Sequence, residues 1–193
     1  MLLMSLVLLH SLPAYATTFD IQPVEEPLSQ PTWVQYLGDQ YPHMDLFWRY
    51  SLQYDLPLTW VLAIASVESG FMPRAMNIAG NSYFPKTMDE ALDLDKKHPG
   101  KSKDYGLGQI NSQWLRRFQL SAEQVLEPHV NIMLMSYILN ECFNSWGSTM
   151  VAIGCYHHPP SKDMQRALDY ARKVSVRQKQ IERNLLRAGY SQG

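Results

Sequence analysis

Glu68 ends a strongly apolar segment, and its position favours acid chemistry. Residues 58–68 read LTWVLAIASVE, which predicts a helix buried on almost all sides. At helical spacing Glu68 shares the inward stripe of Val61 and Ala65. Loss of hydration and the negative end of the helix dipole both disfavour a charged carboxylate there, so both raise its pKa. A carboxylic acid that keeps its proton near neutral pH is suited to general-acid cleavage of a glycosidic bond.

Three later segments add polar and aromatic side chains in short motifs. Glu-Ser-Gly-Phe-Met-Pro-Arg-Ala (68–75) is followed by Asp-Tyr-Gly-Leu-Gly-Gln-Ile-Asn (104–111), Ala-Ile-Gly-Cys-Tyr (152–156) and Tyr-Ala-Arg-Lys-Val (170–174). In this order the motifs resemble the lytic transglycosylase domain of the goose-lysozyme-like superfamily, over roughly residues 46–174. The resemblance is strongest to the small exported members that accompany type IV secretion and conjugation machines.

The resemblance implies a reaction and a role for each matching residue. Glu68 matches the sole catalytic acid/base of the family. The implied substrate-binding set is Ser69, Gln109, Tyr156 and Tyr170. Members cleave the β-1,4 bond between N-acetylmuramic acid and N-acetylglucosamine in peptidoglycan, and the muramic C6 hydroxyl closes onto C1 to leave a 1,6-anhydro end. The implied partners are glycan strands and secretion or conjugation proteins, the implied state is a monomer, and no cofactor is implied.

The carboxylates near the motifs agree with this chemistry. Glycoside hydrolysis ordinarily uses two carboxylates, and the Glu-Ser motif supplies one. Asp104 is the best candidate for a second, against the alternative that it caps the turn after it. Two other functions therefore stay open: a muramidase of the same fold, in which water attacks the sugar, and a wall-binding assembly factor without turnover.

The chain departs from the family pattern in three places. Gly108 stands where many members have Met, and Tyr156-His157-His158-Pro159 replaces Tyr-Asn-x-Gly. The segment 77–103 is longer than usual, which predicts a flap over the groove or a docking surface. The two histidines lack an acidic residue at a metal-ligand spacing, so no metal site is expected.

The aromatic residues divide into two groups. Tyr83 and Phe84 lie in the long polar segment and are the better candidates for substrate contact. The tryptophans are expected in the core; they are Trp33, Trp48, Trp60, Trp114 and Trp146.

The elements that must position these residues are mostly helical. Capping boxes begin helices after Thr87 and Ser121, and Gly147 ends one. Helices are expected at 43–54, 58–68, 88–97, 112–119, 122–126, 128–145, 149–156 and 161–188, with a minor strand-like excursion at 77–86. The expected fold is all-α, a lysozyme-like single domain with a catalytic groove.

The predicted organisation has four parts. Residues 1–16 are apolar and end in Ala-Tyr-Ala, which predicts a signal peptide cut after Ala16 and a periplasmic protein. A lead-in at 17–42, a catalytic domain at 43–175 and a basic helical extension at 176–193 follow. Seventeen basic and eighteen acidic side chains give the 193 residues a net charge of −1, which argues against a basic nucleic-acid binder.

Cys142 and Cys155 are the two cysteines. They fall in successive predicted helices joined by a turn at Trp146-Gly147-Ser148, an arrangement that favours a disulfide over two buried thiols. Residues 161–193 hold eight basic and three acidic side chains, which indicates a solvated face or a surface for an anionic polymer or membrane.

Overall fold

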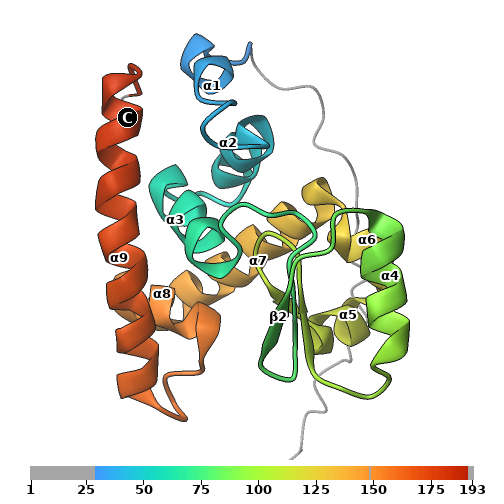
Figure 1. Cartoon of the computed structure of the whole chain (residues 1–193). Helices are drawn as coiled ribbons and strands as arrows, with labels where there is room; N and C mark the ends of the chain where they lie inside the picture. The colour runs from blue at the N-terminus through green and yellow to red at the C-terminus, as the bar shows by residue number, and fades with distance from the viewer. Residues whose placement is uncertain (1–28, 148, 191–193) are drawn as a thin grey trace, which may run out of the picture.

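The chain folds as a mostly helical unit with a small sheet on one side (Figure 1). The computed structural model describes residues 29–147 and 149–190; the predicted signal peptide and the first part of the lead-in lie outside them. The helices are Thr32–Tyr36 (α1), Met44–Gln53 (α2), Leu58–Glu68 (α3), Met88–Lys97 (α4), Ser112–Phe118 (α5), Ala122–Leu126 (α6), Pro128–Trp146 (α7), Thr149–His157 (α8) and Met164–Arg187 (α9). The strands are Met76–Ile78 (β1), Asn81–Tyr83 (β2), Lys103–Tyr105 (β3) and Ile110–Asn111 (β4). Among the described residues, no helix is both long and apolar enough to cross a membrane.

The helix ends follow local signals in the sequence. Thr87 and Glu90 form a capping box at the start of α4, and Ser121 and Gln124 form another at the start of α6. Gly147 adopts a left-handed conformation with φ 58° and ends α7. The expected helices are therefore confirmed to within about one residue at most ends, although α9 begins three residues later than expected.

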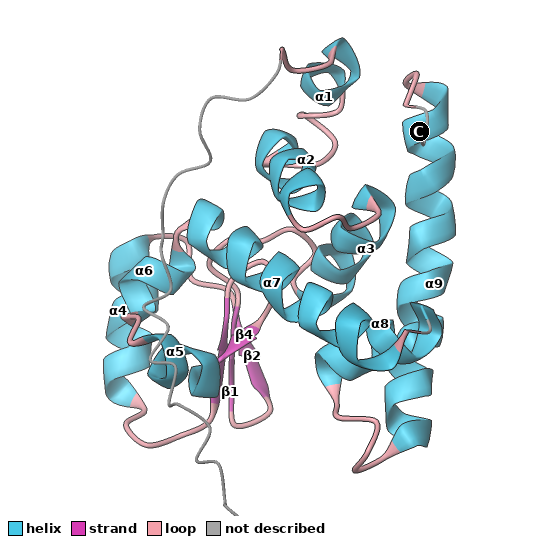
Figure 2. Ribbon diagram, turned by 180° about the vertical axis from the view of Figure 1, so that it is seen from behind, coloured by secondary structure: helices cyan, strands magenta, loops and turns pink. Residues whose placement is uncertain are grey.

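The buried centre of the fold is α3, which packs against α2 and α9. Its segment 61–65 is completely inaccessible to solvent. The helix α9 runs along the full height of the molecule, with α8 between it and α7 (Figures 1 and 2). The expected boundary at 175/176 falls inside this continuous helix, and Ile181 and Leu185 beyond it are core residues.

Part of the lead-in packs more firmly than its prolines suggest. The helix α1 was not expected there, yet Val34 lies on it and is buried, as are Leu37 and Tyr41 after it. Because these side chains join the main core, residues from at least Val34 onward belong to the folded unit.

The sheet is antiparallel, with the strand order β2-β1-β3-β4. The excursion expected at 77–86 is confirmed as the hairpin β1–β2. The absence of strands from 103–111 was a wrong prediction, because β3 and β4 lie there. Asp104 therefore belongs to a strand and not to a loop.

Candidate active site

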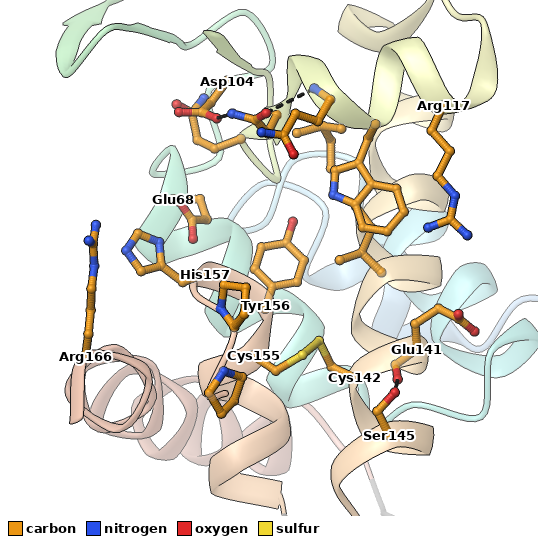
Figure 3. A pocket seen from close by; sticks show the side chains of 18 of the residues that line it. Glu68, Asp104, Arg117, Glu141, Cys142, Ser145, Cys155, Tyr156, His157 and Arg166 are labelled. Atoms are coloured by element: carbon orange, nitrogen blue, oxygen red, sulfur yellow. Dashed lines mark hydrogen bonds between the residues drawn. A yellow bond between two sulfur atoms is a disulfide. The ribbon is translucent and has the colours of Figure 1, made fainter. Parts of the chain in front are cut away.

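A pocket of about 990 Å³ opens between the sheet, α5, α7, α8 and the start of α9. Figure 3 shows Glu68 beside Tyr156 in this pocket, with Asp104 above them and the Cys142–Cys155 disulfide below. Of the residues expected at the site, Glu68, Gln109 and Tyr156 line the pocket, as does Asp104.

Glu68 ends α3, and its carboxyl group has a raised pKa. Burial raises its pKa to about 7, a hydrogen bond from Tyr170 opposes the rise, and the negative charge of Asp104 adds to it. The group is partly exposed, so a ligand in the pocket can reach it. A carboxyl group with this pKa gives and takes a proton near neutral pH.

Tyr170 holds the Glu68 side chain from behind. Its hydroxyl donates to Glu68 Oε1 over 2.6 Å, and its ring stacks on the His157 imidazole with centroids 4.6 Å apart. Burial, followed by the Glu68 charge, keeps the pKa of Tyr170 well above its usual range, so the hydroxyl remains a donor. Tyr170 is not among the residues that line the pocket, and it acts on the Glu68 carboxyl rather than on the open space.

Gly154 lets α8 and α9 approach closely enough to bring Tyr156 and His157 to this position. A Cβ on Gly154 would lie 2.5 Å from the carbonyl oxygen of Ala167 on α9. A side chain here would therefore push apart the helices that carry the aromatic residues of the site.

The turn 106–109 is fixed to α7 by the buried side chain of Asn131. The Asn131 amide donates to the carbonyls of Tyr105 and Val125 over 2.9 and 2.7 Å, and its oxygen accepts from the Gly108 backbone N–H over 2.8 Å. Gly106 makes room for this contact, because a Cβ there would lie 2.3 Å from Asn131 Nδ2. The turn thereby becomes a rigid part of the pocket floor.

Gly108 is required by the side chains that surround it. A Cβ on Gly108 would lie 2.8 Å from the Tyr156 hydroxyl and 2.9 Å from Met135. The Tyr156 hydroxyl donates to the Gly108 carbonyl over 2.6 Å. Tyr156 and Met135 thus occupy the space that any side chain at position 108 would need.

Gln109 completes the turn in a left-handed conformation with φ 48°. Its amide nitrogen donates to the carbonyls of Ala75 and Gly106 over 3.1 and 2.9 Å. The amide oxygen is left as the atom available to a ligand in the pocket.

The Ser69 side chain is buried and does not line the pocket. Its buried hydroxyl lies 3.1 Å from the Ala65 carbonyl and 2.9 Å from the Leu107 carbonyl. Ser69 thus ties the end of α3 to the 106–109 turn, and direct contact with a substrate, as the sequence analysis implied, has no support in this geometry.

The sheet presents one row of polar residues to the pocket. Strand register pairs Ser82 with Asn77, Asn77 with Asp104, and Asp104 with Asn111, and all four line the pocket. Asn111 donates to Asp104 Oδ1 over 2.7 Å. Burial raises the pKa of Asp104, and this hydrogen bond opposes the rise.

Two tryptophans expected in the core line the opposite end of the pocket. Trp114 lies on α5 and Trp146 ends α7. Arg117 lies over the Trp114 ring, 5.1 Å from its centroid. Sequence reasoning missed both tryptophans, although α5 begins directly after Asn111 and so keeps Trp114 close to a motif already singled out. Trp48 agrees with the expectation, since it is buried in the core.

The disulfide between Cys142 and Cys155 is confirmed, with the two Cα atoms 5.8 Å apart. It joins α7 to α8 and forms part of the pocket wall. Since Cys155 directly precedes Tyr156, the bond restrains the segment that carries a pocket-lining hydroxyl.

The long segment 77–103 lines two separate hollows. Its hairpin contributes Asn77 and Ser82, whereas Tyr83 and Phe84 line a separate hollow beside α4. These two aromatic residues, the better candidates for substrate contact by sequence, do not line the pocket that holds Glu68. The Lys103 ammonium binds Asp95 Oδ1 over 2.6 Å and anchors α4 to the sheet.

The chain is similar to two kinds of curated protein. The type IV secretion system protein VirB1 of Brucella suis is 29% identical over 108 residues, which are 49% of this chain and 45% of that protein. The chain thus spans about half the length of the VirB1 relatives that it matches. Protein IpgF of Shigella flexneri is 29% identical over 141 residues, or 69% of this chain and 80% of that protein.

A solved structure shares the fold. The lytic transglycosylase Slt from Pseudomonas aeruginosa, in an inactive mutant form, superposes with a TM-score of 0.51 at 19% identity, covering 79% of this chain and 26% of that one. The mostly helical, lysozyme-like fold expected from the sequence is therefore confirmed. Residues 45–178, more than half of the chain, match the model of the transglycosylase SLT domain. The chain belongs to the transglycosylase SLT domain family.

Proposed function

We propose that this protein is a peptidoglycan lytic transglycosylase that uses Glu68 as its acid and base. The observation that carries the proposal is the Glu68 carboxyl itself. It faces a large pocket, accepts a hydrogen bond from Tyr170 over 2.6 Å, and has a pKa raised to about 7. Family membership supports the same activity.

The reaction needs one group that first gives a proton and then takes one. Protonated Glu68 donates its proton to the glycosidic oxygen, and the bond from C1 of N-acetylmuramic acid to that oxygen breaks. The C6 hydroxyl oxygen of the same sugar then bonds to C1, and its proton passes to the Glu68 carboxylate. The product ends in 1,6-anhydromuramic acid, and Glu68 is returned to its protonated state.

The other pocket residues position the glycan. The polar row from Ser82 to Asn111 offers hydrogen-bond partners to the hydroxyl and acetamido groups of the sugars. Trp114 and Trp146 offer apolar rings at the far end. Gln109 and Tyr156 line the same pocket and offer further polar groups to the glycan.

A muramidase of the same fold is the second candidate, because Asp104 lies in the same pocket and its charge acts on Glu68. In that reaction a water molecule would attack C1, with Asp104 as the second carboxylate. The hydrogen bond from Asn111 and the position of Asp104 in the polar row support a substrate-positioning role instead.

The products and two variants distinguish these candidates. Purified peptidoglycan incubated with the protein should release muropeptides lighter by one water than their reducing-end counterparts, as measured by mass spectrometry. Glu68→Gln should abolish release, whereas Asp104→Asn should slow it without changing the product mass. Reducing-end products that disappear in Asp104→Asn would establish the hydrolase. No release by the wild-type protein would favour a wall-binding assembly factor.

The proposed cellular role is local opening of the wall for a secretion or conjugation apparatus. Relatives named as type IV secretion system proteins support it. The same role requires export to the periplasm, which the apolar segment 1–16 would direct. Fractionation of cells before and after osmotic shock, followed by N-terminal sequencing, tests both export and cleavage after Ala16.

A further inference from the structure

Arg166 places a guanidinium group at the Glu68 end of the pocket. It lies in the first turn of α9, is exposed, and lines the pocket beside His157. Figure 3 shows its side chain running up along the pocket wall to the level of the His157 ring. Burial and then the charge of Arg166 lower the pKa of His157, which agrees with their proximity.

Two acidic residues lie within three positions of Arg166 in the sequence, and each already accepts a hydrogen bond from another group than the Arg166 guanidinium. The Asp163 carboxylate caps the helix by accepting from the Arg166 backbone N–H over 2.9 Å. Asp169 accepts from Gln165 and from Arg172. Within residues 29–147 and 149–190, the Arg166 guanidinium forms no hydrogen bond, no ion pair and no contact with an aromatic ring.

Arg117, the other arginine that lines the pocket, has its guanidinium over aromatic rings. It lies over the rings of Trp114 and Phe118, with its central carbon 5.1 and 5.5 Å from their centroids. Arg166 is thus the cation whose donors remain available to a ligand on the Glu68 side. A planar guanidinium presents two parallel N–H donors, the geometry that matches a carboxylate.

The substrate of the proposed reaction carries its negative charge in one kind of group. The sugar rings are neutral, whereas the lactyl substituent of N-acetylmuramic acid bears a carboxyl group. This carboxyl is either free or amide-linked to a stem peptide that has carboxylates of its own. An unpaired guanidinium beside the acid that cleaves at this sugar therefore has a chemically matched target.

We propose that Arg166 binds a carboxylate of the muramyl substituent, lactyl or peptide, and so makes the protein select glycan strands that carry this charge. The proposal rests on the proposed function and deepens it. Arg166 is a specificity residue here and takes no part in the proton transfers of Glu68.

Three forms of one glycan preparation test the proposal. They are peptide-bearing strands, strands stripped by an amidase to free lactyl carboxylates, and stripped strands whose carboxyl groups are converted to neutral methylamides. Cleavage is measured with the full chain as wild type, Arg166→Gln and Arg172→Gln. The last is a matched control, because Arg172 is the same residue type, is exposed on the same helix, and pairs with Asp169 outside the pocket.

Arg166→Gln should raise KM about tenfold on carboxylate-bearing strands, leave kcat nearly unchanged, and have no effect on neutral strands. A rise in KM confined to peptide-bearing strands identifies a stem-peptide carboxylate as the group that Arg166 binds. A rise in KM confined to stripped strands identifies the lactyl carboxylate. Equal KM values for wild type and Arg166→Gln on every strand would overturn the proposal. An equal rise in KM on charged and neutral strands would also overturn it, because it would indicate a structural role for Arg166.

A binding measurement keeps this test independent of turnover. Sedimentation of the same strands with Glu68→Gln and with Glu68→Gln/Arg166→Gln should show about tenfold weaker binding of charged strands by the double variant. If the wild type cleaves nothing but this difference appears, the proposed function fails and the carboxylate site stands. If cleavage occurs and the difference is absent, only the carboxylate site fails.

Discussion

Replacing Glu68 by Gln should change how the stability of the protein depends on pH. The amide has nearly the shape of the carboxyl group and can still accept the hydrogen bond from Tyr170, but it does not titrate. In the wild type the pKa of Glu68 rises from 4.5 to about 7, mainly through burial. Between these two values the folded protein keeps a proton that the unfolded chain releases. The free energy of unfolding therefore falls as the pH rises through this interval.

The expected magnitude follows from the size of the shift. Each pKa unit corresponds to about 1.4 kcal/mol, so the full shift destabilises the wild type by roughly 3 kcal/mol above pH 7. About 2.5 kcal/mol of this falls between pH 5 and pH 8. Glu68→Gln lacks this contribution and should lose correspondingly less stability over the same range.

Urea unfolding of both proteins at pH 5 and pH 8 measures the effect. The decisive quantity is the difference between wild type and variant at each pH, because the other titrating groups largely cancel in it. From pH 5 to pH 8, the free energy of unfolding of the variant should rise by about 2.5 kcal/mol relative to that of the wild type. Parallel pH dependences would refute the reasoning, because they would mean that Glu68 ionises in the folded protein as it does in water.

Three further substitutions have expected outcomes. Tyr170→Phe removes the donor that stabilises the carboxylate, so the falling limb of the pH–activity profile should move up by about one pH unit; an unmoved limb would contradict this. Gly108→Ala places a Cβ 2.9 Å from Met135, and urea unfolding should show a loss of about 1–3 kcal/mol, whereas wild-type stability would mean that the turn moves freely. Cys142→Ser/Cys155→Ser opens a link between residues 13 positions apart, and the free energy of unfolding should fall by about 3 kcal/mol; no change would show that the bond adds no stability.

Local patterns in the sequence were sufficient to predict most helices and the inward position and raised pKa of Glu68. The all-apolar stretch before Glu68 required a buried helix, and the stripe through Val61 and Ala65 turned Glu68 inward. Capping residues such as Thr87 marked helix starts that the structure confirms. The disulfide was predictable because two cysteines fell on adjacent helices with a short turn between them.

The features that depend on strand register were not predictable in this way. The strands of the sheet are two or three residues long, too short for an alternating pattern to appear in the sequence. The polar row formed by Asn77, Asp104 and Asn111 exists only because the strands pair in one particular register. Composition alone gives no sign of that alignment.

Other features of the fold and the site depend on contacts between distant parts of the chain. Tyr170 reaches Glu68 across 102 positions of sequence. Trp114 and Trp146 resemble core residues in the sequence, and their place at a pocket depends on how the fold brings α5 and α7 to the same cavity. The short helix α1 lies among prolines, and its burial becomes apparent only when the main core is assembled.

The proposed reaction differs from hydrolysis in that no oxygen from water enters the product. The wild-type protein should be incubated with purified peptidoglycan in water enriched in oxygen-18, and the released muropeptides analysed by mass spectrometry. Intramolecular attack by the C6 hydroxyl predicts anhydro ends with no heavy oxygen, and no release by Glu68→Gln under the same conditions. Reducing ends that carry oxygen-18 would contradict the account, because they would show that water, and not the sugar hydroxyl, attacks C1.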